Sequence, residues 1–221
     1  MPFTSRLLMT EFVTHDVKRF IVERPEGLDY KPGQGVELTI DRDGWADQGR
    51  PFTPTSLVDD EVLEFTIKAY PQHHGMTEQL HLLRPGDALT ISESFGTIEY
   101  QGPGTFIAGG AGVTPFIAIL RELAGQGRLD GHSLLYSNKT PDDIICEKEF
   151  RHYLGEAFVP ICTDSDAPGY EHSRIDQAYL SQTIDDFSQH FYICGPPAFT
   201  DSINAALKQL GASPDALVFE K

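Results

Sequence analysis

The chain has 221 residues, of which 40% are hydrophobic and 23% charged, and its formal net charge at pH 7 is −16. A chain of this length forms one or two domains with a substantial core, and its composition excludes a largely disordered protein. The negative charge disfavours nucleic-acid binding, and no apolar run reaches the roughly 18–20 residues that span a bilayer. The first eleven residues also lack the apolar stretch of a signal peptide, so we expect a cytoplasmic protein.

The three cysteines, Cys146, Cys162 and Cys194, lie far apart in the sequence. Without a Cys-x-x-Cys pair they argue against a structural zinc site and a disulfide framework. Three thiolates are also too few for an ordinary four-thiolate iron–sulfur cluster. The adjacent His73 and His74 make a poor metal pair without a third ligand. We therefore expect no metal site, and a redox centre of another kind if the protein transfers electrons.

The first part of the chain, from Leu8 to about Tyr100, consists of short segments in which apolar and polar residues mostly alternate. Turn signals such as Pro32-Gly33 and Pro85-Gly86-Asp87 separate them. Many short strands with this spacing predict an antiparallel barrel or sandwich. One helix is expected within it, over 76–83. The expected strands cover 18–23, 36–40, 62–68 and 88–93.

The pattern changes after Gly102-Pro103-Gly104, where short apolar runs begin to alternate with helical stretches. This alternation predicts a parallel sheet covered by helices on both faces. We place the domain boundary here, with domains at 1–102 and 103–221. The expected strands cover 105–108, 133–136, 157–162, 191–194 and 217–219, and the expected helices cover 115–124, 147–154, 175–180 and 198–210.

A glycine-rich turn, Gly110-x-Gly112-x-x-Pro115, follows the first apolar run of the second half. Thr114 is a suitable helix cap and Pro115 suits the first helical position. The glycines let the backbone approach a bulky anion, and the N–H groups at a helix start favour phosphate. The turn lacks the third glycine of the common dinucleotide fingerprint and the lysine of a triphosphate-binding loop. Tight strand–helix packing is the alternative, but we favour a dinucleotide site because first strands of parallel sheets often carry the ligand.

Two further motifs are ambiguous when each is taken alone. Cys194-Gly195-Pro196-Pro197 places a thiol at the carboxyl end of a predicted strand, where ligands bind in open parallel sheets, but a buried structural cysteine is the commoner interpretation. Arg50-Pro51-Phe52-Thr53 offers a guanidinium fork for phosphate, an aromatic plate and a hydroxyl. A plain edge strand after a surface arginine explains this second motif equally well.

Taken in order, the motifs resemble the ferredoxin–NADP reductase-like flavoprotein family over nearly the whole chain. Each motif is short, but six of them in the right order across the predicted change of domain are specific. The resemblance implies a Greek-key barrel that binds a flavin, followed by a doubly wound, Rossmann-like parallel sheet that binds a nicotinamide dinucleotide. The six are Pro32-Gly33-Gln34, Arg50-Pro51-Phe52-Thr53, Ile67-Lys68-Ala69-Tyr70, Gly75-Met76-Thr77, Gly110-x-Gly112-x-x-Pro115 and Cys194-Gly195-Pro196-Pro197.

The resemblance assigns flavin contacts to the barrel half. Arg50 would pair with the flavin phosphate, Phe52 would lie on the isoalloxazine ring, and Thr53 would hydrogen-bond the ring nitrogen that accepts hydride. A turn at the start of the barrel helix would bind pyrophosphate through backbone N–H groups, which favours FAD over FMN. That turn consists of Gly75, Met76 and Thr77, and the residues flanking the flavin would be Pro51, Ile67, Lys68 and Tyr70.

The resemblance also assigns the nicotinamide dinucleotide contacts. Cys194 would lie near the nicotinamide and help to position its hydride-bearing carbon. Phe219 or Glu220, at the C-terminal end, would fill the place of the aromatic or acidic residue that family members often carry beside the flavin. Thr53, Cys194 and Glu220 are thus the catalytic candidates. The other residues expected to contact the dinucleotide are Gly110, Gly112, Thr114, Pro115, Gly195 and Pro196.

The choice between NADH and NADPH depends on charges after the strands of the second domain. Asp164 and Asp166 follow the strand expected at 157–162, where they would repel a 2′-phosphate and accept ribose hydroxyls, so they favour NADH. Lys139 and Arg174 leave NADPH open, because either could hold the extra phosphate.

The resulting hypothesis is an FAD-dependent NAD(P)H oxidoreductase that passes electrons to a separate acceptor. Ferredoxin, flavodoxin, free flavin, a quinone and a ferric compound all remain candidates, although acidic acceptor proteins would be repelled by the net charge. One alternative is an electron-transfer subunit of a larger complex, and another is a non-catalytic dinucleotide-sensing module. A flavin-free dehydrogenase is less favoured because no His/Asp pair stands out. The sequence makes no prediction of the oligomeric state.

Overall fold

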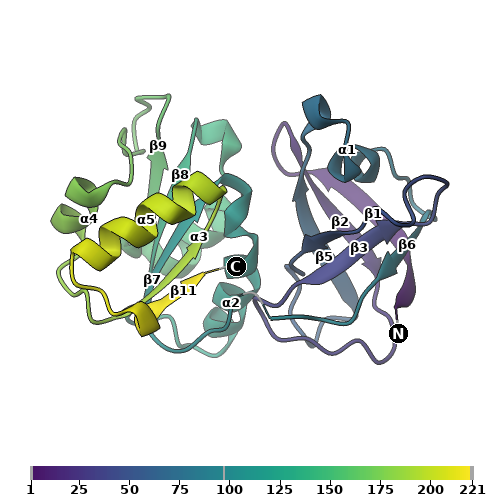
Figure 1. The fold of residues 1–221 in the computed structure, drawn as a ribbon, viewed down its shortest axis with the longest axis horizontal. Coiled ribbons are helices and arrows are strands. Elements are labelled where there is room, and N and C mark those ends of the chain that lie inside the picture. Colours follow the sequence, from purple (N-terminus) through teal and green to yellow (C-terminus); the bar gives the residue numbers. More distant parts are fainter. Residues whose placement is uncertain (1, 97, 220–221) are drawn as a thin grey trace.

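The computed structural model describes residues 2–96 and 98–219, which form two domains lying side by side (Figure 1). The first is an antiparallel barrel, and the second is a parallel sheet covered by helices. The fold class expected from the sequence is therefore confirmed. Within the described ranges, no helix is both long and apolar enough to cross a bilayer.

The barrel domain is a single sheet that nearly closes on itself. Its strands are β1 (Phe3–Phe12), β2 (Val17–Glu23), β3 (Val36–Ile40), β4 (Arg50–Phe52), β5 (Val62–Lys68) and β6 (Ala88–Ile91). They are antiparallel in the order β4-β3-β6-β1-β2-β5, so β6 returns between β3 and β1 in a Greek-key arrangement. The edge strands meet just beyond β4, where Pro54 bridges Phe65 and the Thr55 N–H donates to the Glu64 carbonyl at 2.7 Å.

Alternation of apolar and polar residues fills the barrel core. Val36, Leu38 and Ile40 of β3 point inward, as the period of a strand requires. The helix α1 (Met76–His81) closes one end of the barrel, with Leu80 fully buried against the strands. These elements lie where the sequence pattern predicted them, apart from small shifts at their ends.

Two strands of the barrel differ from the sequence prediction. β1 begins at Phe3, ahead of the recognised pattern, because its inward-facing Ser5 is polar and interrupts the alternation; the Ser5 hydroxyl donates to the Glu23 carbonyl. β4 is too short to show a period. It contains Pro51, which is tolerated because β4 is an edge strand that pairs only with β3.

The second domain is a parallel sheet of β7 (Gly104–Gly109), β8 (Ser133–Asn138), β9 (Phe158–Cys162), β10 (His190–Cys194) and β11 (Leu217–Phe219), in the order β11-β10-β7-β8-β9. The chain moves outward from β7 to β9 and then returns to the other side of β7, so the strand order reverses between β7 and β10. In open sheets a ligand binds at the carboxyl ends beside such a reversal.

Helices cover both faces of this sheet (Figure 1). They are α2 (Thr114–Gly125) and α3 (Glu147–Leu154) on one face, and α4 (Gln177–Thr183) and α5 (Pro197–Gln209) on the other. α2 and α3 pack through Phe116, Leu120 and Phe150, whereas α4 and α5 pack through Leu180 and Leu207. The strands are buried on both faces, which explains their continuous apolar sequences.

The starts of α2 and α4 correct two sequence predictions. Thr114 is not the N-cap of α2: Val113 holds that position, and Thr114 is already helical, with its hydroxyl donating to the Ala111 carbonyl at 3.1 Å. The cause is a 3₁₀ turn over Gly110–Val113 that runs straight into the helix. α4 begins two residues later than predicted because Asp176 caps it, accepting the Tyr179 N–H.

The connection between the domains is held by Tyr192 of β10. Its hydroxyl accepts the N–H groups of Gln101 and Gly102, each at 3.0 Å, and donates to the Gly102 carbonyl at 2.7 Å. Val17 and Ile98 of the barrel join the core cluster around α2. The domains therefore share a continuous apolar contact beside a fixed connection.

Candidate functional site

A cleft of about 990 Å³ lies between the two domains and is lined by both. On one side are the carboxyl ends of the central parallel strands, where Ala108 of β7 lies in register with Cys194 of β10. On the other side are the residues after β4 and the end of β5. The cleft thus lies at the strand-order reversal and brings the two groups of predicted site residues together.

Glycines on the parallel-sheet side are explained by close backbone approach. A Cβ on Gly112 would lie 2.5 Å from the Cys194 carbonyl carbon and 2.6 Å from the Gly195 Cα, so only glycine fits where α2 meets the end of β10. Gly110 is different: its φ is +53°, and nothing lies within 4 Å of the position that a Cβ would take there. Gly112 therefore allows the start of α2 to pack against the end of β10. Gly110 adopts a left-handed turn and leaves the cleft open above it.

The turn is fixed from below by Tyr136 of β8. The Tyr136 hydroxyl donates to the Gly110 carbonyl at 3.0 Å. This ring is completely buried, and its burial raises the pKa of the phenol well above the ordinary value, so the group is a neutral donor. Beside the turn, Cys194 is only 6% exposed yet lines the cleft, together with Gly195 and Pro196.

The barrel contributes an aromatic ring and a hydroxyl to the same cleft. Phe52 and Thr53, with Pro51 before them, line it directly after β4. Ile67 and Lys68 at the end of β5 line it as well. The Ile67 carbonyl lies 2.8 Å from the His81 Nε2 on α1, so the end of β5 is held from behind.

Lys68 forms an ion pair with Asp16 of the β1–β2 turn, with Nζ and Oδ2 2.8 Å apart. Burial raises the pKa of the Asp16 carboxyl, but the hydrogen bond and positive charge of Lys68 outweigh burial, and the pKa lies below its ordinary value. The Asp16 carboxyl is therefore negatively charged at neutral pH. Lys68 therefore presents a cation to the cleft in a fixed place.

Most of the predicted site residues line the cleft. On the barrel side these are Pro51, Phe52, Thr53, Ile67, Lys68, Tyr70 and Thr77; on the parallel-sheet side they are Gly110, Gly112, Thr114, Pro115, Cys194, Gly195 and Pro196.

Several predicted residues lie elsewhere. Arg50 is exposed, and its Nη1 donates to the Gly49 carbonyl at 2.8 Å. The Met76 side chain is buried in the barrel core, so only its backbone faces outward after the N-cap Gly75. Asp164 is exposed, and its carboxylate accepts the Thr163 hydroxyl at 2.9 Å. Glu220 lies outside the described residues.

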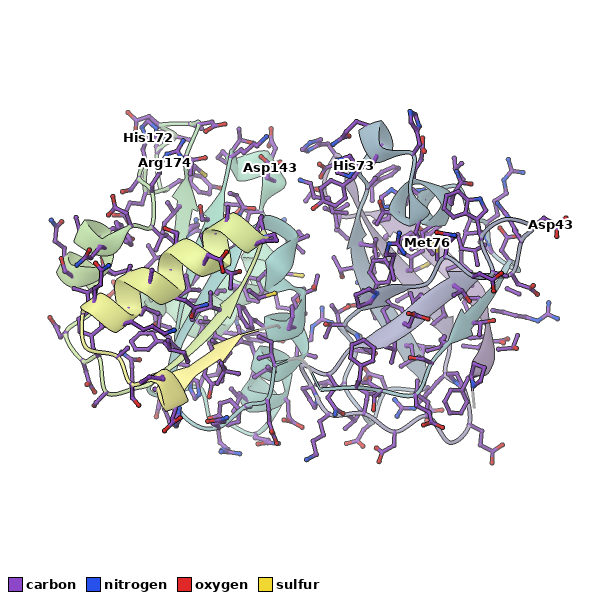
Figure 2. The ribbon with its side chains drawn as sticks, in the orientation of Figure 1. Asp43, His73, Met76, Asp143, His172 and Arg174 are labelled. Atoms are coloured by element: carbon purple, nitrogen blue, oxygen red, sulfur yellow. The ribbon has the colours of Figure 1, made fainter. Side chains whose placement is uncertain are left out.

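The structure adds cleft residues that the sequence reasoning did not assign. Ser137 and Asn138 lie at the carboxyl end of β8, and the rule that pointed to β7 and β10 would have found them. Asp143, by contrast, lies on a short turn and faces the barrel across the cleft mouth, opposite His73 (Figure 2). Its Oδ1 is 3.9 Å from the His15 Nε2 of the barrel. Only the packing of the domains reveals this meeting.

Arg174, a candidate phosphate ligand in the sequence, lies at the upper edge of the parallel-sheet domain in Figure 2 and is not among the residues that line the cleft. It is exposed there, near His172 and beyond β9. Lys139 is thus the basic residue of the two that lines the cleft.

The cleft has the features of a nucleotide-binding site. Its volume is at the upper end of the roughly 300–1,000 Å³ of ligand sites, and it combines an aromatic plate, an open glycine turn at a helix start and a fixed cation. Phe52 and Cys194 approach the same space from different domains. This arrangement allows one planar ring held by the barrel to meet another held by the parallel sheet.

Comparison with known proteins identifies both domains. The sequence profile of the oxidoreductase FAD-binding domain matches residues 4–100, and that of the oxidoreductase NAD-binding domain matches residues 106–205. The chain is 21% identical to the FAD/NAD-binding domain of nitric oxide dioxygenase from Vibrio cholerae, with a TM-score of 0.87 over 99% of this chain and 97% of that one.

Two curated relatives extend beyond the chain. The ferredoxin–NAD(P)⁺ reductase component of the naphthalene 1,2-dioxygenase/salicylate 5-hydroxylase systems of a Ralstonia species is 25% identical over 91% of this chain and 63% of its own length. NADH-cytochrome b5 reductase 2 of Mycosarcoma maydis is 30% identical over 86% of this chain and 60% of its own length. The chain thus spans less than two thirds of these relatives.

Proposed function

The chain belongs to the ferredoxin reductase-like family of flavoproteins, with an FAD-binding and an NAD-binding domain, and we propose that it is an FAD-dependent NAD(P)H oxidoreductase that delivers electrons to a separate acceptor. One observation carries the proposal: Phe52 and Thr53 of one domain line the same cleft as Gly110 and Cys194 of the other. A sensor needs one nucleotide site, whereas a reductase needs two cofactors in contact.

The barrel would hold FAD through the residues around β4 and β5. Phe52 provides a face on which the isoalloxazine ring stacks, and the Thr53 hydroxyl provides a hydrogen bond to the ring. The Arg50 side chain is free to swing from the Gly49 carbonyl to a phosphate, because among the described residues its guanidinium hydrogen-bonds only to that adjacent carbonyl. Backbone N–H groups after Gly75 would bind the pyrophosphate, with Lys68 nearby.

The parallel sheet would hold the nicotinamide dinucleotide at Gly110, Gly112 and the start of α2. These residues receive its phosphates on backbone N–H groups, and Cys194 with Gly195 and Pro196 limits where the nicotinamide can lie. Bound FAD supplies the redox chemistry, accepting two electrons as hydride and releasing them to the acceptor. The chain supplies distance, orientation and exclusion of water.

NADH is the proposed electron donor. Asp143 lines the cleft and adds a negative charge to it, which disfavours the more highly charged NADPH. Four relatives of the chain carry NADH in their names, among them the Mycosarcoma enzyme. Lys139 lines the cleft as well, so the discrimination is expected to be one of degree.

The acceptor is proposed to be an oxygenase component, a cytochrome or a small electron-accepting molecule. The relatives named above are reductases for a ferredoxin and for cytochrome b5, which supports a protein acceptor.

The cytoplasmic location is also a proposal, supported by thiols at Cys146, Cys162 and Cys194, which suit a reducing compartment. Cell fractionation with antibody detection tests it.

We also propose that the boundary between the two domains lies between residues 102 and 103. The two family profiles end at 100 and begin at 106, and Tyr192 holds the connection at Gln101 and Gly102. Expression of 1–102 and 103–221 as separate chains tests this boundary, since a correct one gives two soluble, folded domains.

The test of the function is the visible spectrum of the purified protein under anaerobic conditions. We expect flavin absorption near ~450 nm that bleaches with NADH and more slowly with NADPH. A flavin band that neither nucleotide changes would instead support a subunit or sensor role. A colourless protein that fails to take up added FAD would overturn the proposal.

A further inference from the structure

Arg121 on α2 is the one arginine, among the described residues, that a hydrogen bond joins to both domains. Its Nη1 donates across the interface to the Thr55 carbonyl at 2.6 Å and to the Glu64 carboxylate at 2.7 Å. Its Nε and Nη2 donate to the two oxygens of Glu149 on α3, at 2.6 and 3.0 Å. The fork geometry uses three nitrogens on three acceptor groups, so the guanidinium has a single orientation.

The electrostatics around Arg121 show that the contact is firm. Its side chain is only 20% exposed. Burial raises the pKa of the Glu149 carboxyl, but hydrogen bonds and positive charge from Arg121 outweigh burial and hold that pKa below its ordinary value. The Glu64 carboxylate also accepts the Thr55 hydroxyl at 2.8 Å, so the same acceptor is bonded from both sides of the interface.

The network joins the two cofactor-facing segments by short paths. Thr55 is fully buried and lies two residues after Thr53, so fixing its carbonyl fixes the segment that lines the cleft. Thr114 is the first residue of α2, the helix whose start forms the nucleotide cradle. Arg121 lies two helical turns further along the same helix. A single side chain therefore connects the flavin-facing strand end to the helix beneath the nucleotide.

The interdomain connection alone does not fix the relative orientation of the domains. Tyr192 holds the chain at Gln101 and Gly102, and the apolar contact of Val17 and Ile98 with the core around α2 is non-directional, so neither sets a single orientation. Rotation about the connection would move the nicotinamide site relative to Thr53. A second polar contact away from the connection removes this freedom, and Arg121 makes one on the far side of α2 from its own sheet.

We propose that Arg121 is a positioning residue, which sets the orientation of the nucleotide domain on the flavin domain and thereby the distance between the two cofactor rings. The inference rests on the proposed function. Each cofactor is bound mainly by one domain, and within the barrel Thr55 keeps its hydrogen bonds to the Glu64 carbonyl and carboxylate, so both binding sites are expected to persist without Arg121. Transfer between the rings is lost instead, because a displacement of about 1 Å costs roughly 100-fold in rate.

The experiment compares Arg121→Met and Arg121→Lys with the wild-type chain, all loaded with FAD. The matched control is Arg151→Met, since Arg151 pairs with Glu147 and Gly169 inside the parallel-sheet domain. Three quantities are measured: flavin content, the Kd for NAD⁺, and the rate of flavin bleaching at saturating NADH. A fourth is the long-wavelength charge-transfer absorbance when NAD⁺ binds the dithionite-reduced protein, which requires the rings to stack.

We expect Arg121→Met to keep its flavin content and a Kd within about twofold of wild type, while the saturated bleaching rate falls about 10- to 100-fold and the charge-transfer absorbance is lost. Arg121→Lys keeps the positive charge but loses the forked guanidinium, so its bleaching rate and charge-transfer absorbance should lie between those of wild type and Arg121→Met. If Arg121→Met does not fold, Arg121→Lys decides by the same split. Saturated rate and charge-transfer absorbance equal to wild type would overturn the inference. A wild-type chain that does not bleach would refute the proposed function instead.

Discussion

Arg50 is expected to contribute to FAD binding but hardly at all to the stability of the fold. It is exposed, and its hydrogen bond runs to the carbonyl of its own neighbour, Gly49. Arg50→Ala is therefore expected to change the free energy of unfolding by less than about 0.5 kcal/mol, as surface substitutions usually do. Loss of a charge-assisted phosphate contact costs roughly 1.5–3 kcal/mol, so FAD binding should weaken about 10- to 100-fold.

Flavin content after gel filtration and thermal unfolding of the apoprotein measure these two effects. Arg42→Ala is the matched control, because Arg42 is an exposed arginine of the β3–β4 loop whose partner is the Asp87 carboxylate. Equal flavin retention by Arg50→Ala and Arg42→Ala would show that the phosphate is held elsewhere.

At the scale of elements, the junction of α2 with β10 depends on one glycine. A Cβ at position 112 would lie 2.5 Å from the Cys194 carbonyl carbon and would force two backbone segments apart. We expect Gly112→Ala to destabilise the protein by roughly 1–3 kcal/mol, as overpacking does, and to weaken NADH binding. Gly110→Ala, with open space around its Cβ but a φ of +53°, should cost about 1 kcal/mol.

Urea unfolding and an NAD⁺ titration of both alanine variants provide the comparison. A larger loss of stability in Gly110→Ala than in Gly112→Ala would contradict the packing account of this junction.

Elements with a strong local pattern were predictable from sequence. β3 and β5 have the predicted bounds, because inward apolar residues alternate or run continuously through them. β4 was not predictable as a strand, since three residues show no period. The cap of α2 was wrong by one residue because the 3₁₀ turn before it carries no residue signal of its own.

The site was predictable only where chemistry follows a strand along the chain. The turn after β7 and the segment after β10 were found in this way, and both line the cleft. The approach of Asp143 to His15 and the contact of Arg121 with Thr55 join residues of different domains. Such pairs depend on how the domains pack, and a single sequence read without an alignment carries no signal for them.

At the scale of the whole molecule, the net charge of −16 governs encounters with charged acceptors. An anionic acceptor such as ferricyanide is repelled, and salt screens the repulsion. Its reduction with NADH should therefore speed up several-fold between about 10 mM and about 200 mM salt, while a neutral quinone shows little change. Steady-state rates at matched pH measure this. Slower ferricyanide reduction at high salt would reveal a basic docking patch.

The most direct test of the central claim, hydride transfer across the interdomain cleft, uses NADH deuterated on one face of the nicotinamide or on the other. Phe52 and Thr53 line one side of the cleft and Cys194 the other, so the nicotinamide can present only one face to the flavin. After oxidation, mass spectrometry of the NAD⁺ should show complete loss of deuterium from one stereoisomer and complete retention in the other. Equal loss from both stereoisomers, or no oxidation with any acceptor, would contradict the account.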